Sequence, residues 1–327
     1  MAYSADVVRR ARSILARQRA DRESEVRAHL ARAYAQEPRL REIDKLLRQT
    51  MVQAAQAAFQ KGSDGRAEME QAREDNLALQ QERRELEKRF PEGYLDERPI
   101  CSRCGGTGYV GSQMCACLER LCRQEQRRDL SDMGIRAEDF CQFRLEYYSD
   151  RYDPSFRASP RTIMEKNLER CRRFAREFGR ERANLLFIGN TGLGKTLLSA
   201  CIAGQVADRG YSVAYESAPH LFSKLERERF SPSEEARQQA EKIRSCDLLI
   251  LDDLGTEMPG QFVTASFYTL LNDRLMAEMP MVISTNLNVE EISRRYSPQI
   301  ASRLCGNFAR LTFVGEDVRQ MRREELL

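Results

Sequence analysis

The stretch Gly189-Asn190-Thr191-Gly192-Leu193-Gly194-Lys195-Thr196 matches the pattern G-x-x-x-x-G-K-[ST], and it decides the fold. Residues 184–188 before it predict a buried strand, and residues 197–209 after it predict a helix. Glycines let consecutive backbone N–H groups approach phosphate oxygens, and the helix adds the positive end of its dipole. All eight residues are therefore predicted to bind a nucleoside triphosphate, with Lys195 on the β- and γ-phosphates and Thr196 on Mg²⁺.

Strand and helix patterns alternate beyond this loop. Strands are predicted at residues 211–215, 247–251, 281–284 and 310–313, and helices at residues 220–229, 233–244 and 260–278. Such alternation is typical of a parallel sheet that is covered by helices on both faces. The sequence therefore predicts a three-layer α/β/α domain around the phosphate-binding loop.

Polar residues come at the ends of two predicted strands. Asp252 and Asp253 follow the third strand, and Asn286 comes just after the fourth. We expect Asp252 to hold Mg²⁺ through water and Asp253 to orient or deprotonate the attacking water. Asn286 is placed to bond the γ-phosphate or that water, although an Asn after a strand is often a turn residue. Arg303 is the arginine that we expect to stabilise charge during phosphoryl transfer.

The composition restricts the class of protein. A chain of 327 residues is long enough for two or three structural units. Charged residues make up 31%, but the formal net charge is only +3, so contact with nucleic acid would need a local basic patch. The sequence has neither an apolar stretch of membrane-spanning length nor a hydrophobic signal core at its start. It predicts a soluble, cytoplasmic protein without a membrane partner.

Five of the ten cysteines lie between Cys101 and Cys122, which favours metal binding in a reducing compartment over disulfides. Cys101 and Cys104 have C-x-x-C spacing and are followed by glycines, and Cys115 and Cys117 supply a second pair. Four thiolates make a closed tetrahedral site, so we predict a structural Zn²⁺ on these four residues and no catalytic zinc. Cys122 is near enough in sequence to replace Cys115 or Cys117.

Residues 7–98 are rich in Ala, Arg, Glu, Gln and Leu, and their apolar residues recur at helical spacing. A break is predicted at residues 61–65, and a second helix is predicted to end near residues 91–93, with an apolar stripe of Leu79, Leu86 and Phe90. Two interpretations stay open. The region is either a small helical bundle with solvated charged faces, or a module whose apolar stripes are buried only when a partner protein binds.

A connector between the cysteines and the phosphate-binding loop is rich in aromatic residues. It contains Phe140, Phe143, Tyr147 and Tyr148 and is followed by a helix predicted at residues 160–178. Aromatic residues at this place contact the nucleotide base in one interpretation and belong to the hydrophobic core in the other.

From about Phe140 onward the chain resembles an AAA+ ATPase of the DnaC/DnaI helicase-loader and IstB-like family. The resemblance rests on the segments GNTGLGKT, LLILDDLG, ISTNL, SRLCGNF and GEDVR. It implies that residues 220–229 belong to a helical insertion that contacts single-stranded DNA. It also implies these roles: Walker A residues Lys195 and Thr196, Walker B residues Asp252 and Asp253, sensor 1 Asn286, an arginine finger Arg303 that acts on a neighbouring subunit, and a sensor-2-like, nucleotide-binding Arg319.

The sequence departs from the pattern of most AAA+ proteins in two places. Only eight residues follow Arg319, so the AAA+ domain is expected to lack the C-terminal helical lid. Asp253 stands where many AAA+ proteins have Glu, and its shorter side chain is expected to slow hydrolysis, which suits a switch better than a motor. These expectations divide the chain into a helical partner-binding region (1–98), a cysteine zinc knuckle (99–125), a connector and helix (126–180) and an AAA+ ATPase core (181–327).

The resemblance implies two functions, and the N-terminal region favours one. Helicase loaders place a helicase-binding module, often with a cysteine cluster, before the ATPase, whereas IstB-like transposition helpers have a short, metal-free extension. The sequence therefore predicts an ATP-dependent loader of a hexameric replicative DNA helicase, an ATPase that binds ATP, Mg²⁺ and single-stranded DNA and forms homo-oligomers in its ATP state. The alternatives are a transposition helper, an ATP-binding scaffold without hydrolysis, and a zinc-dependent reader of nucleic acid.

Overall fold

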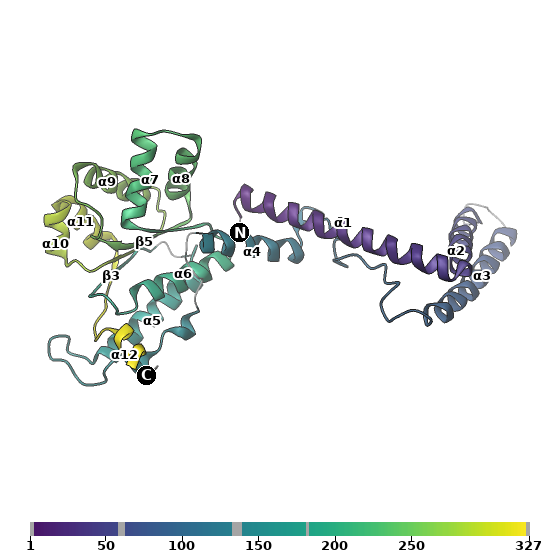
Figure 1. Cartoon of the computed structure of the whole chain (residues 1–327), viewed down its shortest axis with the longest axis horizontal. Coiled ribbons are helices and arrows are strands. Elements are labelled where there is room, and N and C mark those ends of the chain that lie inside the picture. The colour runs from purple at the N-terminus through teal and green to yellow at the C-terminus, as the bar shows by residue number, and fades with distance from the viewer. Residues whose placement is uncertain (1–2, 58–62, 133–138, 181–182, 325–327) are drawn as a thin grey trace. The chain divides into compact units, whose positions relative to one another are not determined.

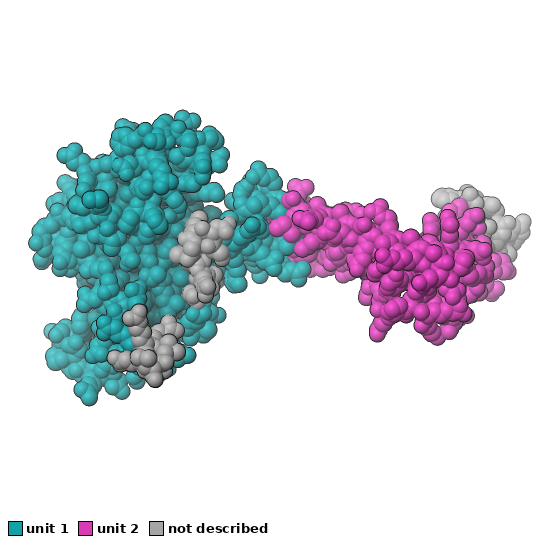
Figure 2. Space-filling view, viewed as in Figure 1, with its two compact units in different colours: residues 1–10, 120–327 teal, residues 11–119 magenta. Residues whose placement is uncertain are grey.

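We describe the protein from a computed structural model, which covers residues 3–57, 63–132, 139–180 and 183–324. The chain forms two compact units (Figure 2). One consists of Ala11–Glu119, and the other of Met1–Arg10 together with Arg120–Leu327. The finer division of the chain at residues 98, 125 and 180 stays a prediction.

The larger unit is built on a parallel sheet in which the phosphate-binding strand lies inside, between two neighbours. Its strand order is β4-β5-β6-β3-β7, and every neighbouring pair is parallel. The strands are β3 (Leu185–Ile188), β4 (Val213–Ser217), β5 (Leu248–Leu254), β6 (Met281–Thr285) and β7 (Ala309–Thr312). The predicted parallel sheet is confirmed, although β4 begins two residues later than expected.

Successive side chains of a strand point to opposite faces of the sheet, and here each face has its own buried core. Leu185 and Phe187 pack in one core, whereas Leu186 packs in the other. The first core includes helices α5 (Pro160–Glu177) and α6 (Lys195–Asp208). The second includes α7 (Ala218–Phe230), α8 (Glu234–Ser245), α9 (Gln261–Met276), α10 (Val289–Arg295) and α11 (Pro298–Asn307) (Figure 1). The predicted three-layer α/β/α architecture is confirmed.

Two features of this unit differ from the sequence prediction. Strand β5 does not stop before the paired carboxylates but runs through Asp252 and Asp253 to Leu254, with a register shift against β6. Helices α10 and α11 were not predicted, although both carry local signals. Asn288 begins α10 with a capping box, and Ser297 caps α11 one residue before a proline.

The smaller unit holds α2 (Pro38–Ala57), α3 (Ser63–Glu87) and most of α1 (Ala5–Gln36), since the unit begins at Ala11. α2 and α3 pack side by side (Figure 1), and Arg83 of α3 bonds Asp44 of α2 at 2.8 Å. The helical prediction is confirmed, with two corrections. The chain breaks at Glu37, where Pro38 suits the first helical position, and Ser63 begins α3 instead of lying in the predicted break. Lys61 and Gly62 of that break lie outside the described residues.

Short elements complete the chain. A two-stranded antiparallel hairpin, β1 (Tyr109–Val110) and β2 (Gln113–Met114), precedes helix α4 (Ala116–Asp132). Two 3₁₀ turns, η1 (Phe140–Gln142) and η2 (Leu145–Tyr147), precede α5, and α12 (Val318–Glu324) follows β7. Among the described helices, none combines the length and the apolar character that crossing a bilayer requires.

Candidate nucleotide site

The phosphate-binding loop connects β3 to α6, and its glycines are required by the backbone. Gly192 and Gly194 have φ angles of 79° and 85°, in the left-handed region that only glycine occupies without cost. Lys195 is the first residue of α6, so the loop ends at the N-terminus of a 14-residue helix. Both features suit an anion, because free N–H groups and the positive end of the helix dipole meet there.

The structure brings Lys195 and Asn286 together. The Lys195 ammonium lies 2.7 Å from each of three oxygens, which are the Gly189 carbonyl, the Asn190 carbonyl and Oδ1 of Asn286. Burial lowers the pKa of Lys195, and the charges of Asp253 and Asp252 oppose that shift. One hydrogen bond therefore joins the predicted Walker A lysine at the start of α6 to the predicted sensor residue, which directly follows β6.

The two carboxylates lie in different surroundings at the end of β5. Asp252 is only 5% exposed, whereas Asp253 lines the cavity beside the loop. Burial raises the pKa of Asp253, and Asp252 raises it further, while Lys195 and Arg319 act to lower it. A carboxylate with a raised pKa is a better proton acceptor, which suits the role of a base toward water.

The cavity has a volume of about 250 Å³ and lies between the loop and the aromatic connector. Tyr148 donates a hydrogen bond to the Leu193 carbonyl at 3.0 Å, and its ring stacks on Phe143 at 5.5 Å. Phe143 and Tyr148 are buried, as the core interpretation predicts, and both also line the cavity, while contact with a nucleotide base stays a prediction. The full lining is Gln142, Phe143, Arg144, Tyr147, Tyr148, Thr191, Gly192, Leu193, Gly194, Lys195, Thr196, Leu197, Asp253, Thr256, Asn286, Val318 and Arg319.

Helix α12 places Arg319 at this cavity through a contact that the sequence did not reveal. The Val318 N–H bonds the Gly192 carbonyl at 3.1 Å, and the Asp317 carboxylate accepts from the Arg319 N–H at 2.9 Å. A side chain at Gly192 would meet that carboxylate, because an added Cβ would lie 2.0 Å from Oδ1 of Asp317. Asp317 therefore joins the start of α12 to the phosphate-binding loop.

This contact predicts that Gly192→Ala weakens nucleotide binding. The substitution adds a Cβ at a left-handed position, which costs about 1–2 kcal/mol of stability, and it forces Asp317 away from the loop. We expect about a tenfold loss of ATP affinity, equivalent to about 1.4 kcal/mol, in a titration with a fluorescent analogue. Gly260→Ala is the matched control, because Gly260 has no heavy atom within 4 Å of its added Cβ. Equal affinities for the two variants would contradict the argument.

Arg303 does not line the cavity of its own chain. It lies on α11, where its guanidinium stands 4.6 Å from the ring centroid of Tyr268 and donates to the Tyr268 hydroxyl at 2.9 Å. A further bond to Asn272 is 3.3 Å long. These contacts hold the side chain at the surface of α9 and α11, so its predicted role requires a site on another subunit.

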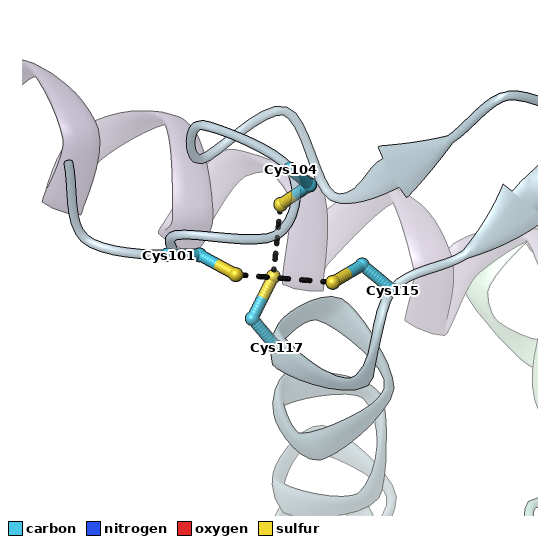
Figure 3. A group of neighbouring side chains, drawn as sticks. All are labelled: Cys101, Cys104, Cys115 and Cys117. Carbon is cyan, nitrogen blue, oxygen red and sulfur yellow. Dashed lines mark hydrogen bonds between the residues drawn. The ribbon is translucent and has the colours of Figure 1, made fainter.

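The four predicted zinc ligands form one cluster in the smaller unit (Figure 3). The Sγ atoms of Cys101, Cys104, Cys115 and Cys117 all lie within 4.8 Å of one another, and Cys122 is not part of the group. The sulfur–sulfur distances are 3.8 Å for Cys101 and Cys115 and 3.4 Å for Cys104 and Cys117. A tetrahedral ion with Zn–S bonds of about 2.3 Å requires sulfurs about 3.8 Å apart. A disulfide requires about 2.05 Å, so the cluster fits zinc better.

Backbone N–H groups around the first cysteine pair favour thiolates. Burial acts to raise the pKa of Cys104, but hydrogen bonds from the Gly108 N–H, the Cys117 thiol and the Gly106 N–H lower it to about 6. The N–H groups of Cys104 and Arg103 lower the pKa of Cys101. Thiolate is the form that binds metal, so the first cysteine pair suits Zn²⁺, whereas burial and the neighbouring thiols raise the pKa of Cys117 to about 12.

The fold and the loop geometry together define a P-loop ATP-binding protein of the AAA+ class. A comparison with family models assigns residues 120–306, more than half of the chain, to the IstB-like ATP binding proteins. The chain belongs to this family, and the resemblance seen in its motifs is confirmed.

Curated relatives match parts of the chain. The replicative helicase loader DnaC of Escherichia coli K12 is 23% identical over 137 residues, which are 42% of this chain and 56% of that protein. The replicative helicase loader DnaI of Bacillus subtilis is 25% identical over 114 residues, or 35% of this chain and 36% of that protein. An IS1162 putative ATP-binding protein of Pseudomonas fluorescens is 30% identical over 134 residues, or 41% and 56%. The chain thus matches about half the length of the DnaC relative.

Solved structures resemble about half of the chain at low sequence identity. The crystal structure of the DnaC helicase loader matches with a TM-score of 0.44 and 17% identity, over 54% of this chain and 98% of that one. AMPPCP-bound DnaA from Aquifex aeolicus matches with a TM-score of 0.41 and 21% identity, over 50% of each chain.

Proposed function

We propose that this protein is a cytoplasmic ATP-dependent loader of the hexameric replicative DNA helicase. The observation that carries the proposal is the pairing of an IstB-like ATP-binding core with a separate unit that holds a helical pair and a four-cysteine cluster. Its relatives DnaC and DnaI bear the name replicative helicase loader.

In this proposal the larger unit hydrolyses ATP. The loop from Gly189 to Thr196 binds the phosphates. The Lys195 ammonium leaves the three oxygens that it contacts in this structure and neutralises the phosphate charge. Asp253 accepts the proton of the attacking water, and Asn286 orients that water or the γ-phosphate. Thr196 and Asp252 would hold Mg²⁺ with their hard oxygen donors, and the ion would offset the charge of the phosphates. Arg319 binds the nucleotide from α12.

A second subunit completes the site in this proposal. Arg303 lies outside the cavity of its own chain, held at the α9–α11 surface by Tyr268. ATP between subunits would then favour a homo-oligomer, because the γ-phosphate is the group that an arginine finger contacts.

Single-stranded DNA is assigned to the surface of α7, α8 and α9. A groove between these helices is lined by Arg229, Arg237 and Arg244, although Arg244 pairs with Glu228 and the groove also holds Glu241 and Asp273. Arg274 is buried and donates to backbone carbonyls, so Arg229 and Arg237 are the arginines offered to phosphates. Phe230 is 66% exposed and lies 5.5 Å from the ring of Phe262. Arginines and exposed aromatic rings are what a single strand requires for its phosphates and bases.

The smaller unit is assigned to the helicase. The pair α2–α3 exposes the apolar side chains Leu46, Met51, Val52, Met69 and Leu77, and the cysteine cluster with its zinc would stiffen the adjoining segment. These exposed apolar side chains on one helical pair suit an interface that is completed by another protein.

The decisive experiment is size-exclusion chromatography with the replicative helicase of the same host, with ATP and with ADP. We expect a complex that Met51→Lys weakens by about tenfold or more, since it places a charge in the apolar interface. Met276→Lys is the matched control, because Met276 is also exposed, at 79% against 68% for Met51, but lies on α9. Absence of a complex with either nucleotide would overturn the loader assignment.

A transposition helper is the second candidate, and the family match with the IS1162 relative favours it. The same chromatography distinguishes the two functions when the helicase is replaced by the transposase of a mobile element from the same host. A stable transposase complex without a helicase complex would select this alternative.

A further inference from the structure

Tyr215 is a buried ionisable group to which the proposed mechanism gives no role. It lies at the centre of β4 and is 3% exposed. Its hydroxyl is 2.9 Å from Oδ2 of Asp252 and 3.5 Å from the Thr196 carbonyl. A phenol has one proton to donate, and the shorter contact to a charged acceptor takes it. Tyr215 therefore donates to Asp252.

The other oxygen of Asp252 is held from the opposite side of β5. Ser284 of β6 donates to Oδ1 of Asp252, and the Ser284 oxygen accepts the Asp253 N–H at 2.9 Å. Hydroxyls from β4 and β6 thus hold both carboxylate oxygens, so the carboxylate has one orientation. Each carboxylate oxygen has about two acceptor sites, which leaves one on each oxygen for a cation or its water.

We propose that Tyr215 is a positioning residue whose hydroxyl fixes the Asp252 carboxylate for Mg²⁺ bound with ATP. The inference rests on the proposed function, because it assumes that Asp252 serves Mg²⁺. Tyr215 does not line the cavity and touches no substrate, so it acts only through Asp252. The same ring would pack equally well without its oxygen, and the placement of the hydroxyl on this one carboxylate is the argument for a role beyond packing.

Tyr215→Phe tests the proposal by removing the hydroxyl alone. The hydroxyl fixes the carboxylate orientation, so we expect the Mg²⁺ concentration that half-saturates binding of a fluorescent ATP analogue to rise about tenfold in its absence. Affinity for the analogue in EDTA should stay within about twofold, because no phosphate contact changes. Mn²⁺ in place of Mg²⁺ gives a second readout, the loss of the free-ion signal in electron paramagnetic resonance.

Tyr296→Phe is the matched control. Tyr296 is also buried, and its hydroxyl also donates to a buried carboxylate, Glu257, away from the cavity. Its Mg²⁺ dependence should equal that of the unchanged protein. If Tyr215→Phe does not fold, Ser284→Ala removes the other hydroxyl and should raise the half-saturating Mg²⁺ concentration in the same way.

The outcomes separate this inference from the function on which it rests. Mg²⁺-dependent binding in the unchanged protein with no shift in Tyr215→Phe overturns the inference alone. An equal shift in Tyr296→Phe also overturns it, because the effect would then be general loss of buried structure. Failure of the unchanged protein to bind ATP with Mg²⁺ overturns both.

Discussion

Replacement of Arg303 by alanine is expected to lower ATP turnover by about 10³- to 10⁵-fold, the range that an arginine finger contributes. Nucleotide affinity should change little, since Arg303 does not line the cavity of its own chain. Phosphate release measured beside analogue binding separates the two effects. Arg310→Ala is the control, because Arg310 is an exposed arginine on the edge strand β7 and should leave turnover unchanged.

Mixing variants tests whether Arg303 acts between subunits. Asp253→Asn removes the base but leaves Arg303, so each variant alone is expected to be inactive. A mixed oligomer holds interfaces with an intact arginine on one side and an intact carboxylate on the other. Partial recovery of phosphate release on mixing would support the intersubunit site, whereas persistent inactivity of the mixture would count against it.

Loss of zinc is the second large effect. Structural Zn²⁺ supplies about 10–16 kcal/mol of binding free energy in small zinc peptides at neutral pH, and this free energy stabilises the folded state against the unfolded one. Cys104→Ser should therefore leave the protein without stoichiometric zinc and unfold the segment around Cys101 to Cys117. Elemental analysis of the metal and hydrogen exchange of residues 100–117 measure the two consequences.

Cys305→Ser is the matched control for zinc, since Cys305 is an exposed thiol on α11. It should retain the metal and the protection of the cluster segment. A protein that carries no zinc before substitution, and whose cluster segment is equally protected in Cys104→Ser, would refute the structural-zinc assignment.

The features that sequence could predict are those with local signals. The eight-residue loop, the strand before it and the helix after it are contiguous, so their pattern is complete within about 25 residues. The cysteine cluster is nearly as local, since its four ligands span Cys101 to Cys117. The alternating strands and helices gave the three-layer architecture for the same reason, because each element carries its own periodicity.

The features that sequence could not predict depend on contacts between distant strands. Tyr215 and Ser284 meet Asp252 only because β4 and β6 flank β5, and an aromatic or a serine in a strand has no signal for such a role. Asp317 was likewise missed, since its contact with Gly192 spans more than a hundred residues. The roles of the site residues themselves stay predictions until nucleotide binding is measured.

The backbone of Asp253 gives another reason for the residue type at this position. Its φ angle is 54°, inside the register shift of β5, and the left-handed region there is tolerated by Asp and Asn better than by other side chains. Lengthening the carboxylate to Glu would thus meet a conformational cost as well as a change of reach. The short acid is compatible with the irregular strand, so the backbone geometry favours Asp over Glu at this position.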